Sequence, residues 1–577
     1  MRRTRAAAWP AYAILALILV AGLYLRLRHN GYGLPYVYNQ DEGRHFTNRA
    51  VAMFGGGSWD PGYYENPSGF TYLLNAAMRF RYGHGWPFGS FDNVVRIFGG
   101  ANPSGVYELT RAVAALLCAA GVAGLFFVAR RLWGVREGLV AAAVLSFAFL
   151  PVAYSRIAVT DVGTLLPIAI ALYASVRIHE RGDLRWYILG GAAVGFAVGF
   201  KYTAGLVLLP LVIATAVRMR TDGLAPLKGL GVALLAATAA FFVTTPYFFI
   251  NFSHAKHQLT SQSQTVGDFD KVGQAQDNGF AYYLWSLTWG LGWVPLAAAA
   301  AGCFLVARRD PVRAVLLAVF PVALFVYLSV QSRFFGRWLL PSYPALALFA
   351  GYAIVQAVNA VAALRGRRLA AAGALAAAAC AALAQPLVAD VRTMQLLGRK
   401  DTRQLARDYL VNTYPPRLRI VIEPAVPGRY YRLARPGRKA PPERKQFVRG
   451  FIRDIGETRI DYVTLLRPEV LDHYRRSGYC LVMTMSVIRG RAENDRLVPA
   501  LAYYALLERE SKLVFEASPY DQGVKHLKFN FDHSYDYYPS QFARPGPDVK
   551  IYRLDNCKQG YGPLPAGSGV VPQGLSE

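Results

Sequence analysis

The chain has 577 residues, of which 54% are hydrophobic and 17% are charged, and its mean hydropathy is +0.23. A soluble domain cannot hide that share of apolar surface, so the composition excludes an ordinary soluble protein and predicts a membrane protein. The net charge of +27 does not indicate nucleic-acid binding, because the arginines come in short clusters between apolar runs and form no continuous basic stripe.

About eleven apolar segments approach the roughly 20 residues that a helix needs to cross a bilayer. The first segment follows Met1 and three arginines, as in a signal peptide, but no small-residue cleavage site precedes the next polar loop. We therefore expect it to be a retained helix. The segments lie near residues 8–28, 106–129, 137–153, 158–177, 186–200, 202–217, 229–250, 281–307, 314–330, 338–360 and 369–389.

The positive charges predict the orientation of these spans, because short cytoplasmic loops retain Lys and Arg. With the N-terminus in the cytoplasm, every inner loop carries a cluster, whereas the short outer turns hold only Arg156, Lys201, and Arg333 with Arg337. An odd number of spans then places the chain after residue 390 outside the cytoplasm. The inner clusters are Arg130, Arg131, Arg136; Arg177, Arg181, Arg185; Arg218, Arg220, Lys228; Arg308, Arg309, Arg313; and Arg365, Arg367, Arg368.

Two outer loops, residues 30–105 and 251–280, are too long to be simple turns, and long loops often carry function. The first loop contains GRHFTNRAVAMF and GFTYLLNAAMRF, whose apolar residues recur at helical spacing. We expect short helices that lie on the membrane surface. Helices that only pack over the transmembrane bundle are the alternative.

The chain becomes charged and aromatic from about residue 390, which predicts a soluble extracytoplasmic α/β domain over residues 390–577 after a transmembrane domain over 1–389. The runs LRIVIEP, DYVTLL and DVKIYRL favour strands, and DTRQLARDYLVNTY and PALAYYALLERE favour helices. A Gly/Pro/Ser tail is expected to be loose. Cys480 and Cys557 lie in this domain, where oxidation is permitted, so a disulfide and two buried thiols both remain open.

The cysteines show no metal-ligand spacing, so no zinc site is expected. The second long loop could still hold a divalent metal, although a polar loop accounts for the same residues. We expect no cofactor. The residues concerned are Asp268, Asp270, Asp277, His254 and His257.

Three acids are candidate catalytic residues. Asp41 and Glu42 lie in YNQDEGRH, about a dozen residues beyond the first span. Solvated loop acids are the ordinary interpretation of such a pair. Asp161, in AYSRIAVTDV, lies at the outer mouth of an apolar helix, where an ionisable group is costly and usually functional, although the helix dipole also favours an acid there.

Three cations are candidate phosphate ligands. Lys201 in GFKYTAG stands alone at the outer end of two apolar spans, and Arg333 and Arg337 lie four residues apart in QSRFFGRW. If that stretch is helical, the two guanidinium groups share one face and suit a cluster of anionic oxygens. Snorkelling at a helix end is the alternative for each cation.

The predicted topology places all of these acids and cations on one side of the membrane, although they are far apart in sequence. A carboxylate beside cations is what sugar transfer from a lipid phosphate requires. The carboxylate deprotonates the acceptor hydroxyl, and the cations stabilise the charge that develops on the leaving phosphate.

These features resemble the GT-C glycosyltransferases, in the branch of the protein O-mannosyltransferases and the lipid A aminoarabinose transferase. The resemblance covers about two-thirds of the chain and rests on the order and sidedness of short motifs. The motifs are YNQDEGRHFTNRAVAMFGGGSWDPGYYENPSGFTYLL, AYSRIAVTDVGTLL, KYTAGLVLLP and RFFGRWLLPSYPALALFAG.

The resemblance implies a catalytic role for Asp41, with Glu42 beside it, and places Asp161 in the same cavity. Lys201 and Tyr202, which open KYTAGLVLLP, are also expected to bind substrate. The family's first loop often has two prolines before the Tyr-Leu run, whereas this chain reads ENPSGFTYLL, so the sugar and the acceptor stay open. The WWD signature of oligosaccharyltransferases is absent from the sequence, which argues against transfer of whole glycans to Asn.

A lipid-linked donor also follows from chemistry, because nucleotide sugars are cytoplasmic and no Gly-rich strand-to-helix turn is present to hold a nucleotide diphosphate. We therefore expect a membrane glycosyltransferase whose donor phosphate lies among Lys201, Arg333 and Arg337 and whose single displacement inverts the anomeric centre. The acceptor would be an extracytoplasmic protein, glycan or lipid. A polytopic transporter and a non-catalytic lipid-carrier-binding protein remain open as alternatives.

Overall fold

The computed structural model describes residues 9–54, 58–82, 103–267, 270–275, 277–364, 371–414, 420–424, 462–534, 537–557 and 571–572. The chain divides into two compact units. The first comprises Met1–Asn30, Asp41–Phe269 and Asn278–Arg392, and the second comprises Gly31–Gln40, Asp270–Asp277 and Thr393–Glu577. The last boundary lies close to the expected one at residue 390, but the two short segments of the second unit come from loops that were expected to belong to the transmembrane domain.

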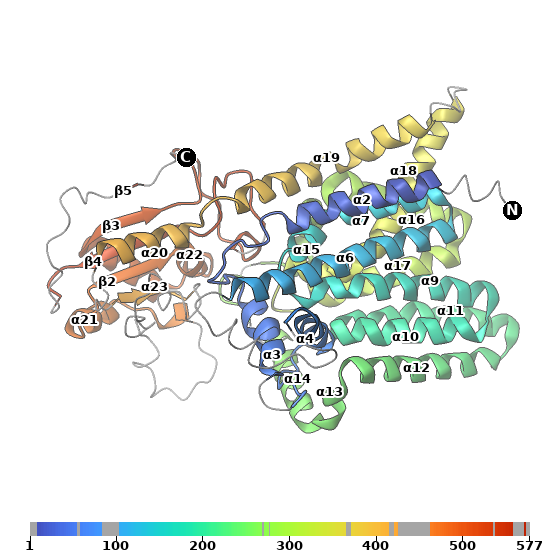
Figure 1. Cartoon of the computed structure of the whole chain (residues 1–577), viewed down its shortest axis with the longest axis horizontal. Coiled ribbons are helices and arrows are strands. Elements are labelled where there is room, and N and C mark those ends of the chain that lie inside the picture. The colour runs from blue at the N-terminus through green and yellow to red at the C-terminus, as the bar shows by residue number, and fades with distance from the viewer. Residues whose placement is uncertain are drawn as a thin grey trace. The chain divides into compact units, whose positions relative to one another are not determined.

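The first unit is a helical bundle whose long helices run side by side in Figure 1. Its helices are α2 (Trp9–Leu27), α3 (Asn48–Ala52), α4 (Gly69–Tyr82), α6 (Ser104–Leu132), α7 (Val135–Phe147), α8 (Phe149–Tyr154), α9 (Leu165–Arg181), α10 (Leu184–Phe200), α11 (Leu208–Asp222), α12 (Ala225–Thr244), α13 (Pro246–Ile250), α14 (Phe252–Gly267), α15 (Gly279–Leu287), α16 (Trp293–Arg309), α17 (Pro311–Ser329), α18 (Tyr343–Leu364) and α19 (Ala371–Leu397).

The protein is a polytopic helical membrane protein. Within the described residues, nine helical segments are long and apolar enough to cross a membrane. Two other expected spans are shorter: α10 has 17 residues, and the segment near 137–153 is divided into α7 and α8 by the extended residue Ala148. The expected count of about eleven spans therefore stays a prediction.

Small residues bring α10 and α12 close together, and the two helices lie side by side in Figure 1. A Cβ atom added to Gly191 would lie 2.0 Å from the carbonyl oxygen of Ala233, and one added to Gly195 would lie 2.1 Å from that of Ala237. Only glycine permits this backbone approach, which is typical of helix packing in membranes. The contact fixes α10, whose C-terminal end leads directly into Lys201.

The helices expected in the first outer loop are confirmed. GRHFTNRAVAMF forms a π-helical turn, η1 (Asp41–Thr47), followed by α3, and GFTYLLNAAMRF forms α4. On α4, Phe70, Leu74 and Met78 recur every four residues and are fully buried, and the helix contacts α6 and α10. The apolar face of α4 therefore packs against the helical bundle.

The second unit is a five-stranded mixed sheet with helices on both faces, as Figure 1 shows. The strand order is β1-β2-β4-β3-β5. Pairs β1/β2 and β3/β5 are parallel, and β2/β4 and β3/β4 are antiparallel. The elements are β1 (Ile420–Ile422), β2 (Leu481–Met485), β3 (Ser511–Ala517), β4 (Val549–Leu554), β5 (Val571–Pro572), α20 (Thr402–Thr413), α21 (Glu469–Arg476), α22 (Ser486–Asn494) and α23 (Val498–Arg509).

Alternating residues of the strands supply the two faces of this sheet. Ile420 and Ile422 pack with α20, whereas Val421 packs with the helices of the opposite face. The expected strands in LRIVIEP and DVKIYRL and both expected helices are confirmed. The strand expected in DYVTLL is wrong. This segment forms a 3₁₀ helix, η8 (Tyr462–Leu465), and its Val463 is buried in the same hydrophobic cluster as Val421.

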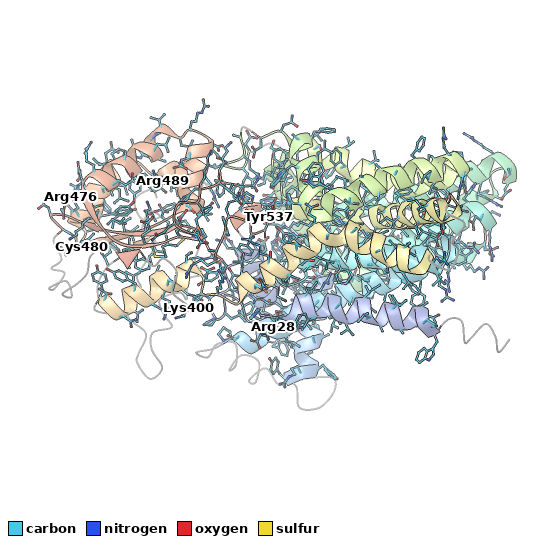
Figure 2. The ribbon with its side chains drawn as sticks, turned by 90° about the horizontal axis from the view of Figure 1, so that it is seen from above. Arg28, Lys400, Arg476, Cys480, Arg489 and Tyr537 are labelled. Atoms are coloured by element: carbon cyan, nitrogen blue, oxygen red, sulfur yellow. A yellow bond between two sulfur atoms is a disulfide. The ribbon has the colours of Figure 1, made fainter. Side chains whose placement is uncertain are left out.

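The second unit contains a disulfide between Cys480 and Cys557, with a Cα–Cα distance of 5.5 Å; Cys480 is labelled in Figure 2. Cys480 directly precedes β2, so the bond ties the chain beyond β4 to the sheet. Most of the expected loose tail, residues 558–570 and 573–577, lies outside the described residues.

A segment of the first outer loop, Gly31–Gln40, is built into the second unit. The ring of Tyr38 lies under the guanidinium of Arg403, 3.6 Å from its carbon, and Arg403 forms a 2.8 Å ion pair with Asp401. The hydroxyl of Tyr32 donates a 2.8 Å hydrogen bond to Asp401. The chain that leads into Asp41 is therefore held by buried contacts at the start of α20.

Candidate active site

Asp41 and Glu42 open η1, and their side chains have different surroundings. Glu42 is fully buried, and its carboxylate forms a bidentate ion pair with Arg111 of α6 at 2.7 and 2.8 Å. The backbone N–H of Ala158 donates a further 3.0 Å hydrogen bond to it. Glu42 therefore connects η1 to α6 and to the chain before η2 (Thr160–Thr164), and it does not face open space.

The Asp41 side chain is 36% exposed and accepts a 2.5 Å hydrogen bond from Nη2 of Arg337. Its other oxygen lies 3.9 Å from Nε2 of His45, whose ring meets that of Tyr63 edge-on at 4.7 Å. Burial lowers the pKa of His45, so the neutral imidazole is favoured beside Asp41. Asp41 is thus the accessible carboxylate of the pair.

Asp161 lies on η2, is 4% exposed and forms an ion pair with Nζ of Lys201. Lys201 lies between α10 and η3 (Tyr202–Val207), and its backbone is extended. Because both groups are buried, each neutralises a charge that would otherwise be costly at this depth. The structure thus brings together two residues that the predicted topology places on one side of the membrane.

The Asp41–Arg337 and Asp161–Lys201 ion pairs form one cluster. The 3₁₀ helix η5 (Gly336–Ser342), which carries Arg337, contacts η2, and η2 also contacts α10. The Lys201 ammonium interacts electrostatically with Asp41 and Arg337, and Arg337 interacts with Asp161. Two carboxylates and two cations are therefore assembled from four segments that are far apart in the sequence.

The proposed shared face of Arg333 and Arg337 is wrong. Residues 333–335 are not helical, and η5 begins only at Gly336, so the i, i+4 argument does not apply. Phe335 is extended and leads into η5, which turns Arg337 toward Asp41. Tyr202, the other expected substrate ligand, donates a 3.0 Å hydrogen bond to the carbonyl of Tyr64.

Sequence reasoning missed Arg111. It lies in an apolar run near the start of α6 and is 3% exposed, and its Nη1 also donates a 2.6 Å hydrogen bond to the carbonyl of Asn30. An ionisable group inside a predicted span was the available signal, because such groups almost always have a partner. Arg156 has a similar structural role: it donates to the carbonyl of Leu25 at 2.7 and 2.9 Å.

The residues considered for a metal do not form a cluster within the described ranges, where no group of three His, Cys, Asp or Glu side chains is suited to hold an ion. His254 is hydrogen-bonded to Gln258, and its ring packs edge-on against Tyr64. Asp270 and Asp277 belong to the second unit, and Asp268 lies outside the described residues. Whether the protein uses a cofactor stays a prediction.

Comparison with known proteins identifies the fold. The chain resembles the oligosaccharyltransferase of Archaeoglobus fulgidus in its apo form, with a TM-score of 0.51 and 14% identity over 91% of this chain and 75% of that one. It has the GT-C fold. A crystal structure of ArnT from Cupriavidus metallidurans bound to undecaprenyl phosphate matches with a TM-score of 0.48 and 16% identity over 72% of this chain and 82% of that one.

Residues 96–249 match the family model described as dolichyl-phosphate-mannose-protein mannosyltransferase. This range contains two residues of the cluster, Asp161 and Lys201. It also contains Arg111, which pairs with Glu42. None of the curated proteins matches the chain.

Proposed function

We propose that this protein transfers a sugar from a polyprenyl-phosphate carrier to a hydroxyl of an extracytoplasmic acceptor, with inversion at the anomeric carbon. The observation that carries the proposal is the Asp41–Arg337 pair, an accessible carboxylate held directly beside a cation. The matched family model is named for a sugar donor of this chemical class, a polyprenyl-phosphate-linked mannose.

Asp41 is the general base in this mechanism. It removes the proton of the acceptor hydroxyl as the acceptor oxygen forms its bond to the anomeric carbon. The bond between that carbon and the phosphate oxygen breaks, and the electron pair leaves with the polyprenyl phosphate. Because the acceptor attacks opposite the leaving group in one displacement, the configuration of the anomeric carbon is inverted.

The cations of the cluster stabilise the leaving phosphate. Arg337 has five N–H donors in a fork that matches phosphate oxygens, and Lys201 adds a second positive charge. Asp161 holds Lys201 in place, and Glu42 holds η1 against Arg111, so both acids act through other residues. Preorganised cations of this kind lower the free energy of the transition state in which negative charge develops on the phosphate.

A transfer assay tests this proposal. The full chain in proteoliposomes would be incubated with radiolabelled polyprenyl-phosphate hexose or pentose and with a membrane or cell-wall extract as the acceptor source. We expect label to move from the lipid to a second product in an Asp41-dependent manner. Movement of intact labelled lipid or free sugar across the bilayer without a new product would support the transporter alternative instead.

The orientation is tested separately by cysteine labelling. Lys512 is exposed on β3 in the second unit. Lys512→Cys, in a chain whose Cys303 and Cys380 are replaced by Ser, should react with an impermeant maleimide in intact cells. Reaction only after permeabilisation would place the second unit in the cytoplasm and exclude an extracytoplasmic acceptor.

A further inference from the structure

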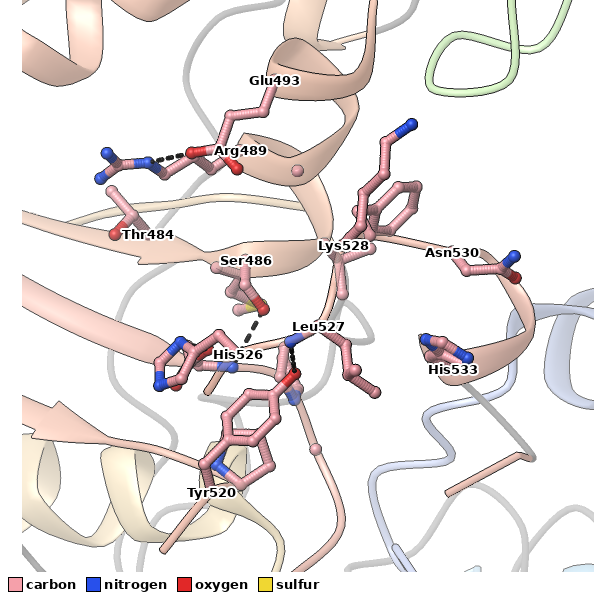
Figure 3. A pocket seen from close by; sticks show the side chains of 18 of the residues that line it. Thr484, Ser486, Arg489, Glu493, Tyr520, His526, Leu527, Lys528, Asn530 and His533 are labelled. Carbon is pink, nitrogen blue, oxygen red and sulfur yellow. Dashed lines mark hydrogen bonds and ion pairs between the residues drawn. The ribbon is translucent and has the colours of Figure 1, made fainter. Parts of the chain in front are cut away.

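A cavity in the second unit has a lining that the proposed transfer reaction does not use. Its volume is about 320 Å³, which lies at the small end of the roughly 300–1,000 Å³ typical of small-molecule sites. It lies where β2 leads into α22, beside the chain between Pro519 and Asp548, and Figure 3 shows it from close by.

Aromatic rings form one wall of the cavity. The rings of Tyr520 and His526 are stacked with centroids 4.2 Å apart and an interplanar angle of 12°, and Phe542 supports Tyr520 edge-on at 5.0 Å. The hydroxyl of Tyr520 accepts a 3.1 Å hydrogen bond from the N–H of Leu527, which fixes the ring. The His526 side chain is 59% exposed, so this supported stack presents a flat surface to a ligand.

Polar groups surround that surface and are held in position. Asp548 accepts a 2.5 Å hydrogen bond from the hydroxyl of Ser518 and lies 3.5 Å from Nδ1 of His526. The N–H of Asp548 donates a 3.0 Å hydrogen bond to the hydroxyl of Ser486. Lys528 and Asn530, labelled in Figure 3, follow Leu527 along the wall. The cavity therefore combines one flat ring surface with several directional donors and acceptors.

The charges of the lining balance. Its three carboxylates, Glu493, Glu508 and Asp548, are matched by three cations, Arg489, Lys528 and Lys550. Arg489 forms ion pairs with both glutamates, at 2.8 Å with Glu493. Burial lowers the pKa of His533 to about 4, so that ring is neutral at physiological pH. A balanced lining gives no electrostatic preference for a strongly charged ligand.

We propose that this cavity binds a neutral saccharide, with one sugar ring packed on the His526–Tyr520 stack and its hydroxyls hydrogen-bonded by Lys528, Asn530 and Asp548. A pyranose has an apolar C–H face and a polar edge, and the cavity offers a flat ring surface bordered by donors and acceptors. The site goes beyond the proposed transfer reaction and does not depend on it, because it requires neither a donor lipid nor Asp41.

Saturation-transfer NMR on the full chain in nanodiscs tests this site without any donor lipid. The probes are methyl hexopyranosides and neutral disaccharides of glucose, galactose and mannose, with glucuronic acid, inorganic phosphate and a short neutral peptide as comparisons. We expect at least one neutral saccharide to bind. His526→Ala and Asn530→Ala should each weaken its binding about tenfold, as the loss of one good contact does.

Lys512→Ala is the matched control, since it removes an exposed cation of the same unit that does not line the cavity. It should bind the saccharide normally, and all variants should keep the wild-type melting temperature. The proposal is overturned if no neutral saccharide binds, if binding survives in the His526→Ala/Asn530→Ala double variant, or if only phosphate, glucuronic acid or the peptide binds. Loss of transfer in Asp41→Asn with normal saccharide binding would concern the proposed function alone.

Discussion

Arg337 donates a 2.5 Å hydrogen bond to Asp41, although 296 residues separate them in the chain. The contact gives the accessible acid of η1 a cationic neighbour, as the proposed transfer reaction requires. The adjacent acid, Glu42, is directed instead into a buried pair with Arg111. Two neighbouring carboxylates therefore have separate tasks, and their substitution should affect different properties.

Asp41→Asn should abolish most sugar transfer while leaving folding intact. The amide can still accept a hydrogen bond from Arg337 but cannot take a proton from the acceptor. Loss of a general base costs about a hundredfold to ten-thousandfold, so we expect kcat to fall at least about a hundredfold. Turnover of labelled lipid-linked sugar measures this, with Asp41→Glu as the variant that keeps a carboxylate. Turnover near the wild-type rate would exclude Asp41 as the base.

Glu42→Gln should lower stability more than it lowers the rate of the folded fraction. Its partner Arg111 has a side chain that is 4% exposed, and removing one member of a buried ion pair costs about 3–5 kcal/mol because the other charge is left uncompensated. Thermal melting in detergent should show a clear decrease. Glu108→Gln is the control, because Glu108 is an exposed acid on α6, one turn before Arg111. This variant should have the melting temperature of the wild type. An unchanged melting temperature for Glu42→Gln together with complete loss of kcat would make Glu42 catalytic.

Arg337→Gln should weaken the use of donor lipid more than the use of acceptor. A hydrogen bond to a charged group contributes about 1.5–3 kcal/mol, so the kcat/KM for donor should fall about tenfold to a hundredfold. Arg333→Gln provides the comparison, because Arg333 lies before η5 and does not share a helix face with Arg337. We expect the smaller effect from Arg333→Gln. Equal effects of both substitutions would contradict the assignment of Arg337 as the principal phosphate ligand.

The pH dependence of stability should include a contribution from Glu423. This acid is fully buried at the end of β1, where it accepts hydrogen bonds from the N–H of Met485 at 2.6 Å and the hydroxyl of Tyr504 at 2.7 Å. Burial raises its pKa to about 8. The folded state therefore holds this proton more tightly than the unfolded state. The resulting contribution to the free energy of unfolding is fully present below about pH 4.5 and is lost as pH rises to about 8.

Glu423→Gln should remove that dependence, because the amide remains neutral at every pH. The melting temperature of the variant should exceed that of the wild type above pH 8 and approach it near pH 5. Differential scanning fluorimetry of the full chain across this range measures the difference. A difference that is constant with pH would show that Glu423 does not hold the proton.

Part of the cluster could be predicted from sequence because Asp161 and Lys201 interrupt apolar runs. Asp161 and Lys201 flank spans, and charge topology placed them on the same side as Asp41 and Arg337. The pairing partners could not be predicted. Glu42 and Arg111 are 69 residues apart, and their contact depends on how η1 packs near α6, which no local pattern records.

The second unit shows a similar limit. The strands β1 and β4 could be found from their β-branched residues, but β2 was missed because all five of its residues are buried and it shows no alternation of apolar and polar positions. The packing of Tyr36 and Tyr38 against α20 was also missed, because most of the helices of the bundle lie between these residues and α20 in the sequence.

The contact between Tyr32 and Asp401 can form only late in synthesis of the chain. Tyr32 leaves the ribosome 369 residues before its partner Asp401, an interval of roughly 20 to 70 seconds at typical rates of synthesis. The bundle is therefore synthesised before the partner of the aromatic segment that precedes Asp41. Anchoring of the segment before Asp41 is therefore a late, long-range event, and a nascent chain that stops before α20 would lack the contacts of this segment with Asp401 and Arg403. Completion of the second unit is thus tied to the synthesis of α20.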